Sequence, residues 1–165
     1  MRKNIILSIL PALLIVIVDQ ITKAVIAGAI RFHESIEVID GLFNLVHVRN
    51  RGMAFGLMNR PDVNLGFYIL VAATIIAVIL LAYWLSTLKS GENSLRFGLS
   101  LILGGAIGNL IDRIRLGEVI DFLDFYINTY HWPSFNVADS AITVGTIFVA
   151  VNLLIYGTTE NKSDK

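Results

Sequence analysis

The stretch IILSILPALLIVIVDQITKAVI, residues 5–26, is long and apolar enough to cross a membrane, yet it contains Asp19 and Lys23. A helix needs ~20 apolar residues to cross about 30 Å of hydrocarbon. A charged side chain at that depth costs at least about 2.5–3.5 kcal/mol on insertion scales. The two charges therefore serve a purpose, either by pairing for structure or by taking part in chemistry.

Three further apolar runs of similar length occupy residues 65–85, 95–114 and 137–156. The chain is 55% hydrophobic and only 16% charged, with a mean hydropathy of +0.71. A soluble domain of this size is rarely so apolar. The sequence therefore predicts an all-α membrane protein with four transmembrane helices, forming a single integral-membrane domain over residues 1–165.

The remaining composition narrows the function. The 13 Lys and Arg residues balance the 13 Asp and Glu residues, so charge gives no reason to expect a nucleic-acid partner. The sequence has no cysteine and only 3 histidines, which are scattered. Thiol catalysis and disulfides are excluded, and the sequence predicts no metal site and no cofactor.

Basic residues indicate the orientation of the spans. They precede the first span, bracket the short loop between the second and third, and follow the fourth: Arg2, Lys3, Lys89, Arg96, Lys162 and Lys165. The positive-inside rule then places both termini in the cytoplasm. Four arginines in the first external loop oppose this assignment, namely Arg31, Arg49, Arg51 and Arg60. That loop is longer and is expected to fold, so the N-terminal signal should dominate.

This topology brings the unusual polar residues to one side of the membrane. The first and third spans run outward and the fourth runs inward, so their polar ends meet at the external interface. The residues concerned are Asp19, Lys23, Asn109, Asp112, Arg113, Asp121, Asn136 and Asp139. Spacing and topology alone lead to this convergence, which predicts a site at the external membrane surface.

Two external segments carry their own patterns. Residues 36–56 contain β-prone arms around the tight turn Asp40–Gly41, which predicts a small β-platform or, equally well, an ordinary hairpin loop. The platform edge would suit an extended peptide. Residues 122–135 are rich in aromatic side chains, which favour the headgroup region, and we expect an interfacial loop there.

Asp121 and Asp139 are the candidate catalytic pair. Two carboxylates brought close together share a proton, so that one activates water while the other donates to a carbonyl oxygen. Each residue also has an ordinary explanation. Asp139 follows Asn136 as an acid in the first turn of a helix follows its N-cap, and Asp121 would be a solvated loop acid. The convergence at one interface favours function over these explanations.

Lys23 has two possible roles. Asp19 and Lys23 are four residues apart and face one another on a helix, so they form a self-neutralising ion pair with Lys23 extending outward to the interface. The competing hydrolase chemistry is a dyad of Ser140 and Lys23. We rank it well below the carboxylate pair, because the carboxylate one turn away keeps Lys23 charged and a poor base.

The end of the third span contains a further polar group. Asn109 and Arg113 share a helix face, and Arg113 suits a carboxylate or a substrate carbonyl, although an arginine at a helix end is often an interfacial anchor. Gly104 and Gly108 form a GxxxG pattern, which predicts close packing of helices.

These residues fall in five motifs that together resemble one known family, bacterial lipoprotein signal peptidase, also called signal peptidase II. The motifs occur in the family's order along nearly the whole chain. They are DQITK at 19–23, NRGMAFG at 50–56, GGAIGNLIDR at 104–113, VIDF at 119–122 and FNVADS at 135–140.

The resemblance implies an aspartic endopeptidase of the bacterial cytoplasmic (inner) membrane. Such an enzyme removes signal peptides from diacylglyceryl-modified prolipoproteins, on the N-terminal side of the lipidated cysteine. The implied fold is four transmembrane helices with an external β-cradle and an external loop or helix. The antibiotic globomycin is the implied inhibitor, and membrane lipid surrounds the enzyme.

The resemblance also implies residue roles. The catalytic pair falls on Asp121 and Asp139, with the active site on the external or periplasmic face. The positions that line the site or bind substrate are Asp19, Lys23, Asn50, Gly52, Asn109, Arg113 and Asn136. A single copy carries every group that the chemistry needs, so we expect a monomer.

The alternative class is a small four-helix transporter that uses its intramembrane Asp and Lys residues. Carriers usually place their site near the midplane between repeated halves. Here the polar residues lie toward one face, and the sequence shows no internal repeat.

Overall fold

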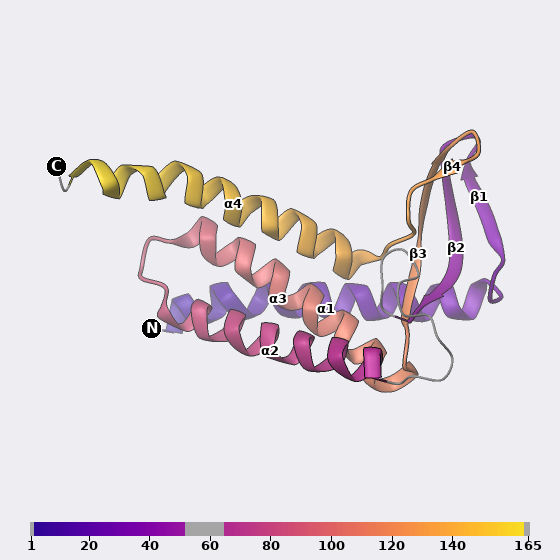
Figure 1. The fold of residues 1–165 in the computed structure, drawn as a ribbon, viewed down its shortest axis with the longest axis horizontal. Coiled ribbons are helices and arrows are strands. Elements are labelled where there is room, and N and C mark those ends of the chain that lie inside the picture. The colour runs from indigo at the N-terminus through magenta and orange to yellow at the C-terminus, as the bar shows by residue number, and fades with distance from the viewer. Residues whose placement is uncertain (1, 52–64, 164–165) are drawn as a thin grey trace.

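The computed structural model describes residues 2–51 and 65–163, which contain four long helices and a small sheet (Figure 1). Each helix includes a stretch that is long and apolar enough to cross a membrane. The helices are α1 (Arg2–Ala29), α2 (Leu65–Thr87), α3 (Asn93–Leu116) and α4 (Val137–Ser163). The four predicted spans are therefore confirmed, with ends that extend a few residues further.

Helix α3 is the centre of the bundle and packs against α1, α2 and α4. Its glycines allow this close packing. A Cβ atom on Gly104 would lie only 2.6 Å from the backbone oxygen of Ala12 in α1, and one on Gly105 would collide with the backbone oxygen of Ala138 in α4. The predicted role of the GxxxG pattern in helix packing is confirmed. The other helices expose large apolar side chains outward, as lipid-facing surfaces require.

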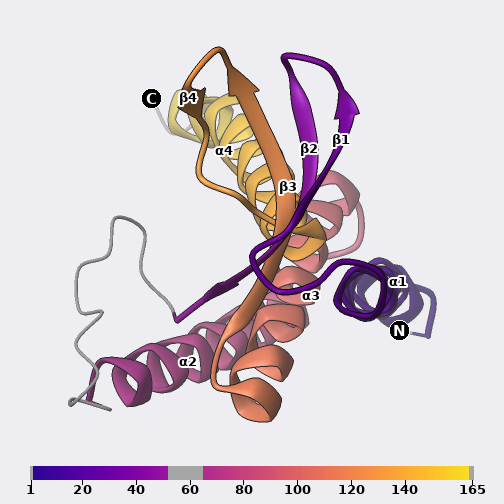
Figure 2. The ribbon, with the colours of Figure 1, turned by 90° about the vertical axis from the view of Figure 1, so that its right-hand side faces the viewer.

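The sheet lies across one end of the helices (Figures 1 and 2). Its strands pair antiparallel in chain order: β1 (Ser35–Ile39), β2 (Phe43–Asn50), β3 (Val119–Ile127) and β4 (Tyr130–His131). The predicted hairpin at Asp40–Gly41 is confirmed, and Gly41 has the positive φ of 72° that this turn requires. The last residues of the predicted platform, 52–56, lie outside the described residues.

The aromatic segment 122–135 differs from the expected interfacial loop. Its first half belongs to β3, and β4 follows after a short turn. The run VIDFLDFYI is rich in β-branched and aromatic residues, which favour a strand once β2 offers a partner. Among the described residues there is no further helix beside the sheet.

Contacts with α1 and α3 hold the sheet on the bundle. Phe122 on β3 packs against Ile26 and Ile30 at the end of α1. The backbone N–H of Ile120 donates a hydrogen bond to Asp112 Oδ2 of α3 at 3.3 Å. The residues on either side of Asp121 in β3 are therefore both held against the bundle. These two contacts limit the directions in which the Asp121 side chain can point.

Candidate active site

Asp121 lies on β3, opposite Val48 of β2, and its side chain is buried. Two amide groups donate to its carboxylate. Asn50 Nδ2 reaches Oδ2 at 3.1 Å, and Asn136 Nδ2 reaches Oδ1 at 2.7 Å. Asp121 is therefore a buried, hydrogen-bonded strand residue rather than the solvated loop acid of the ordinary explanation.

Asp139 lies in the first turn of α4, and Asn136 caps that helix. The Asp139 backbone N–H donates to Asn136 Oδ1 at 2.9 Å, and the Asn136 backbone N–H donates to Asp139 Oδ2 at 3.3 Å. This reciprocal pair is a capping box, so the helix-start role predicted for the two residues is confirmed. The capping bond to Oδ2 leaves Asp139 Oδ1 to accept from Asn109 Nδ2 at 2.8 Å.

Asn136 joins the two carboxylates. It is fully buried, its side-chain amide donates to Asp121, and its backbone amide donates to Asp139. The same side-chain nitrogen also lies 3.3 Å from the backbone oxygen of Ile120. A single residue thus holds the strand acid and the helix acid in one arrangement, although the two are 18 positions apart in the sequence.

Electrostatics at this position favour a retained proton. The pKa of Asp121 is raised to about 7, first by burial and then by the negative charge of Asp139. The hydrogen bonds from Asn50 and Asn136 and the charge of Lys23 act in the opposite direction but do not cancel the effect. A carboxyl group with this pKa exists in both protonation states near neutral pH, as acid–base catalysis requires.

A buried charge cluster lies next to the two acids. Lys23 Nζ is 2.8 Å from Asp19 Oδ2 and 2.8 Å from Asp112 Oδ2, and the Lys23 side chain is only 2% exposed. The expectation that Lys23 extends outward to the interface is wrong, because the closely packed α3 provides a second carboxylate at depth. Asp19 in turn accepts from the backbone N–H of Ala138 at 2.9 Å, which ties α1 to the start of α4.

Asn109 connects this cluster to the catalytic candidates. Its Oδ1 accepts from Lys23 Nζ at 3.0 Å and from Asn136 Nδ2 at 3.3 Å, while its Nδ2 donates to Asp139. Because the ammonium and an amide both donate to Oδ1, the orientation of the Asn109 amide is set. The cluster therefore directs an N–H group at Asp139.

Arg113 keeps donor capacity beside the acids. It makes a long bond, 3.4 Å, from Nη1 to the backbone oxygen of Asn109, and its buried Nε has no hydrogen-bond partner in the described part of the chain. Its charge acts on both Asp139 and Asp121. A buried donor without a partner next to two acids suits a substrate carbonyl better than a purely anchoring role.

The structure also identifies a polar residue that the sequence analysis did not assign to the site. Gln20 Nε2 donates to Asp112 Oδ1 at 2.9 Å and to the backbone oxygen of Gly108 at 3.2 Å. The sequence did contain a sign of this role, because Gln20 is a polar residue inside an apolar run and lies next to Asp19. Gly52, by contrast, was assigned to the site and lies outside the described residues.

The rival serine–lysine dyad has no geometric support. Ser140 Oγ donates to the backbone oxygen of Asn136 at 2.8 Å, and Lys23 is held by Asp19 and Asp112. Within residues 2–51 and 65–163, no hydrogen bond joins Ser140 to Lys23. The lysine is a partner of two carboxylates and is not placed to act as a base.

Comparisons with known proteins agree with this arrangement. The family model described as "Signal peptidase (SPase) II" matches residues 11–155. A lipoprotein signal peptidase of Syntrophus aciditrophicus is 43% identical over 93% of this chain and 96% of its own length. A lipoprotein signal peptidase of Oleidesulfovibrio alaskensis is 49% identical over 92% of this chain and 96% of its own.

The fold has relatives among solved structures. A bacterial membrane enzyme structure determined by the in meso method at 2.3 Å resolution is similar, with a TM-score of 0.81 and 38% sequence identity. The similarity covers 96% of this chain and 92% of that one. Helices, sheet and their relative placement are therefore shared with an enzyme that is embedded in a membrane.

Proposed function

We propose, from the premise that the chain belongs to the signal peptidase II family, that it is an aspartic endopeptidase that processes lipoproteins. It removes the signal peptide from diacylglyceryl-modified prolipoproteins on the N-terminal side of the lipidated cysteine. It works as one integral domain in the bacterial inner membrane. Two lines of support are the relatives named as lipoprotein signal peptidases, and the four apolar helices.

The observation that carries the aspartic mechanism is the double contact of Asn136. It donates to Asp121 and to Asp139 at once, so the two carboxyl groups belong to one site. The pKa of about 7 for Asp121 supports a pair that holds one proton at neutral pH. The pair titrates as a unit, so the proton is assigned to the pair and not to either member.

The chemistry follows from that shared proton. The ionised carboxylate takes a proton from water, and the water oxygen attacks the scissile carbonyl carbon. The protonated carboxyl group donates to the carbonyl oxygen, which gives a tetrahedral intermediate. Collapse of the intermediate breaks the C–N bond, and the departing amine takes up a proton from the pair.

Neighbouring residues would position the substrate. The unpartnered Nε of Arg113 supports a role in binding a substrate carbonyl or the developing negative charge. Asn50 and Asn109 orient the carboxylates by donating to them. Asp19, Lys23 and Asp112 are too deeply buried to touch a substrate, and their role is to hold α1, α3 and α4 together around the site. Gly52 belongs to the same proposal through the family motif alone.

We place the site at the external face of the membrane with both termini in the cytoplasm. The support is the bias of basic residues toward the opposite side and the position of the acids, where the helices meet the sheet. A lipidated substrate can reach this level from within the bilayer, and water can reach it from outside. Every group that the mechanism needs belongs to one chain, which suits a monomer.

The transporter alternative is not supported. The comparisons identify a peptidase family. The buried ion cluster is at one end of the bundle, beside the sheet, whereas a carrier needs its site near the midplane. The charges of the cluster pair with one another, and Asp19 also binds the start of α4, so the cluster links α1, α3 and α4.

The deciding experiment is cleavage of a diacylated precursor by purified protein, followed by a mobility shift on a gel. We expect the unaltered chain to release a shortened lipoprotein and a free signal peptide, and globomycin to block the reaction. Asp121→Asn and Asp139→Asn should each lower turnover by at least about 10³-fold, since each removes half of the acid–base pair.

The matched control is Asp124→Asn, a buried acid on the same strand that pairs with His131 rather than with the catalytic residues. It should retain most of the activity. Near-normal turnover in either Asp121→Asn or Asp139→Asn would overturn the assignment of the pair.

A further inference from the structure

The outer half of the sheet, residues 37–44 and 124–132, has one apolar face. Residues that pair across antiparallel strands share a face. Three of these pairs are apolar on both strands: Ile39 with Phe43, Phe43 with Phe125, and Ile127 with Tyr130. Phe125 and Ile127 are two positions apart on β3, so their side chains point to the same side. The pairing therefore gathers all of these side chains on one face.

The opposite face of the outer half is polar. Asn44 and Asp124 pair across β2 and β3, and Asn44 Nδ2 donates to Asp124 Oδ2 at 3.1 Å. The Asp124 carboxylate also lies 3.0 Å from Nδ1 of His131 on β4. The Tyr126 hydroxyl group donates to Glu37 Oε1 at 2.9 Å. The outer half is therefore amphipathic, as sheets are when one face meets water and the other meets an apolar surface.

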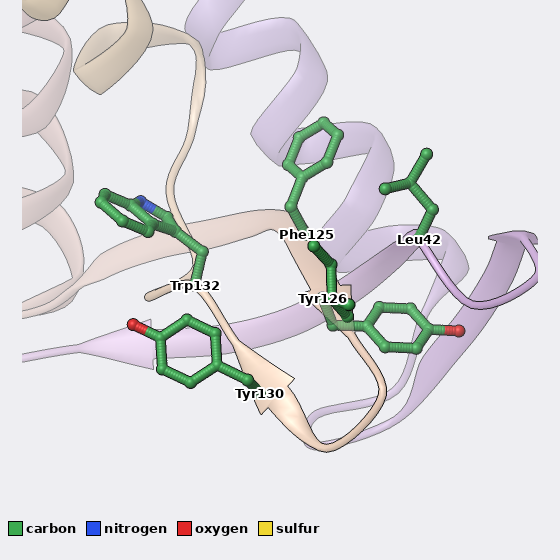
Figure 3. A pocket seen from close by; sticks show the side chains of 6 residues that line it. Leu42, Phe125, Tyr126, Tyr130 and Trp132 are labelled. Carbon is green, nitrogen blue, oxygen red and sulfur yellow. The ribbon is translucent and has the colours of Figure 1, made fainter.

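The described residues leave the tip of the apolar face, Ile127, Tyr130 and Trp132, largely uncovered. The exposed fractions of these three side chains are 68%, 70% and 60%. Figure 3 shows the rings of Tyr130 and Trp132 on one side of a hollow of about 320 Å³, and the Tyr126 hydroxyl group pointing the other way, toward β1. Large apolar side chains gathered in this way mark a contact surface.

The apolar face is the side of the sheet that contacts the membrane-spanning helices. Toward the bundle it continues into the cross-strand pair of Leu45 and Leu123. Both leucines pack against the cluster that contains Ile26 and Ile30, at the end of α1. Val25, next to Ile26, is 61% exposed and belongs to the lipid-facing surface of that helix. The apolar face of the sheet therefore begins where the lipid-facing surface of α1 ends.

The shape of the molecule identifies what covers the rest of this face. The strands run across the outer ends of the helices, and their tips project past the ends of α1 and α4 (Figures 1 and 2). A face that touches α1 near the bundle therefore overhangs the bilayer further out. Tyrosine and tryptophan are the side chains that favour the headgroup level of a membrane, and both occur at the tip. The polar face then points to water.

We propose that the outer half of the sheet rests on the bilayer that the helices span, with Ile127, Tyr130 and Trp132 inserted among the lipid headgroups. The occupant of the apolar face is membrane lipid, and not a soluble partner or a second copy of the chain. Lipid removes the exposed side chains of the tip from water, which is the source of the favourable free energy. Because β3 also carries Asp121, this contact fixes the level of that carboxyl group relative to the lipid surface.

The test uses the two tryptophans of the sequence, Trp84 and Trp132. Trp84→Phe leaves Trp132 as the single fluorophore, and the protein is inserted into phosphatidylcholine vesicles. Bromine on the acyl chains quenches tryptophan, and it is placed either near the headgroup or near the chain end. We expect the fluorescence of Trp132 to fall about twofold with bromine near the headgroup and less with bromine near the chain end. Iodide in the water should quench it little. Both leaflets carry the brominated lipid, so the orientation of the inserted protein does not affect the result.

The matched control moves the fluorophore by one residue, to the polar face. It combines Trp84→Phe and Trp132→Phe with His131→Trp. This tryptophan should be quenched by iodide and not by brominated lipid. If Trp132 itself is quenched by iodide and not by lipid, the apolar face lies in water and the proposal is wrong. Protection of Trp132 from both quenchers would show that protein covers the face, and would also overturn the proposal.

A second variant pair tests the neighbouring side chain while Trp132 remains the reporter. In the Trp84→Phe protein, Ile127→Asp places a charge on the apolar face and should reduce the quenching by lipid at least about twofold. Asn128→Asp adds the same charge in the adjacent turn without removing an apolar side chain, and should leave the quenching unchanged. Equal quenching in the two variants would contradict an inserted Ile127.

This proposal goes beyond the peptidase function and does not depend on it. Quenching is measured without a substrate, so a chain that cleaves no diacylated precursor can still confirm or contradict the lipid contact. Conversely, a tip that lies in water leaves the assignment of Asp121 and Asp139 untouched.

Discussion

Asp121 has a chemical environment that ordinary surface acids do not share. It is buried, it is influenced by the charge of a second carboxylate, Asp139, and its pKa is raised to about 7. If Asp121 and Asp139 form the proposed catalytic pair, the free enzyme loses the proton that they share as pH rises through neutrality. We predict that kcat/KM falls above about pH 7, approaching tenfold per pH unit, because kcat/KM reports ionisations of the free enzyme.

The raised pKa of Asp121 also makes the stability of the folded protein depend on pH, and stability too should fall as pH rises. The folded state holds this proton more tightly than the unfolded chain, so the contribution of Asp121 to stability declines as pH rises from its ordinary pKa range toward 7. Thermal unfolding must therefore be followed across the same pH range. A rate profile that stays flat from about pH 6 to about pH 9 in folded protein would contradict the shared proton. Asp124→Asn should leave the midpoint unmoved.

Lys23 is the residue whose loss should be most damaging to stability. Lys23→Met leaves the carboxylates of Asp19 and Asp112 buried without their cation. Removing one partner of a buried ionic group costs about 3–5 kcal/mol, and we expect the melting temperature in detergent to fall accordingly. Lys89→Met changes an exposed lysine and is the control. Equal melting temperatures for the two variants would show that the cluster does not stabilise the bundle.

At the scale of elements, the glycines of α3 set the spacing of the helices. Gly104→Ala places a Cβ 2.6 Å from a backbone oxygen of α1, which cannot move aside as a side chain would. We predict a loss of about 1–3 kcal/mol in stability from this overpacking. Gly28→Ala is the matched control, because a Cβ there meets nothing within 4 Å. It should be neutral or stabilising by about 0.4–1 kcal/mol, and unfolding in detergent measures both.

The elements differ in how far sequence alone predicts them. The four helices were predictable because a long apolar run is a local property, and the Asp40–Gly41 hairpin because its turn is local too. Strand β3 was missed, since its partner β2 is about 70 positions earlier. An aromatic-rich segment alone is equally typical of an interfacial loop.

The site, too, has features that the sequence predicts and features that depend on tertiary packing. Convergence of the acids at one end of the bundle followed from the direction of each span. The burial of Lys23 did not, because it depends on how closely α3 approaches α1 across Gly104 and Gly108. Asn136 was predictable as a helix cap, but its bond to Asp121 requires the position of a strand that sequence did not indicate.

At the scale of the whole molecule, the orientation in the membrane can be measured directly, because the chain contains no cysteine. Arg31→Cys introduces a thiol at the sheet end of the bundle, and Lys89→Cys introduces one in the loop between α2 and α3. We predict that an impermeant maleimide labels Arg31→Cys in intact spheroplasts and Lys89→Cys only after permeabilisation. The reverse pattern would place the site on the cytoplasmic face.

The hydrogen bond from Ala138 to Asp19 joins the beginning of the chain to its last helix. During synthesis the first helix enters the bilayer long before the fourth is made. Until α4 is made, Asp19 lacks the hydrogen bond from the Ala138 backbone N–H, and Asp121 lacks Asp139 as a neighbour. Under the proposed assignment a partly made chain is consequently inactive, and peptidase activity begins only after α4 has been synthesised and has packed against α1 and α3.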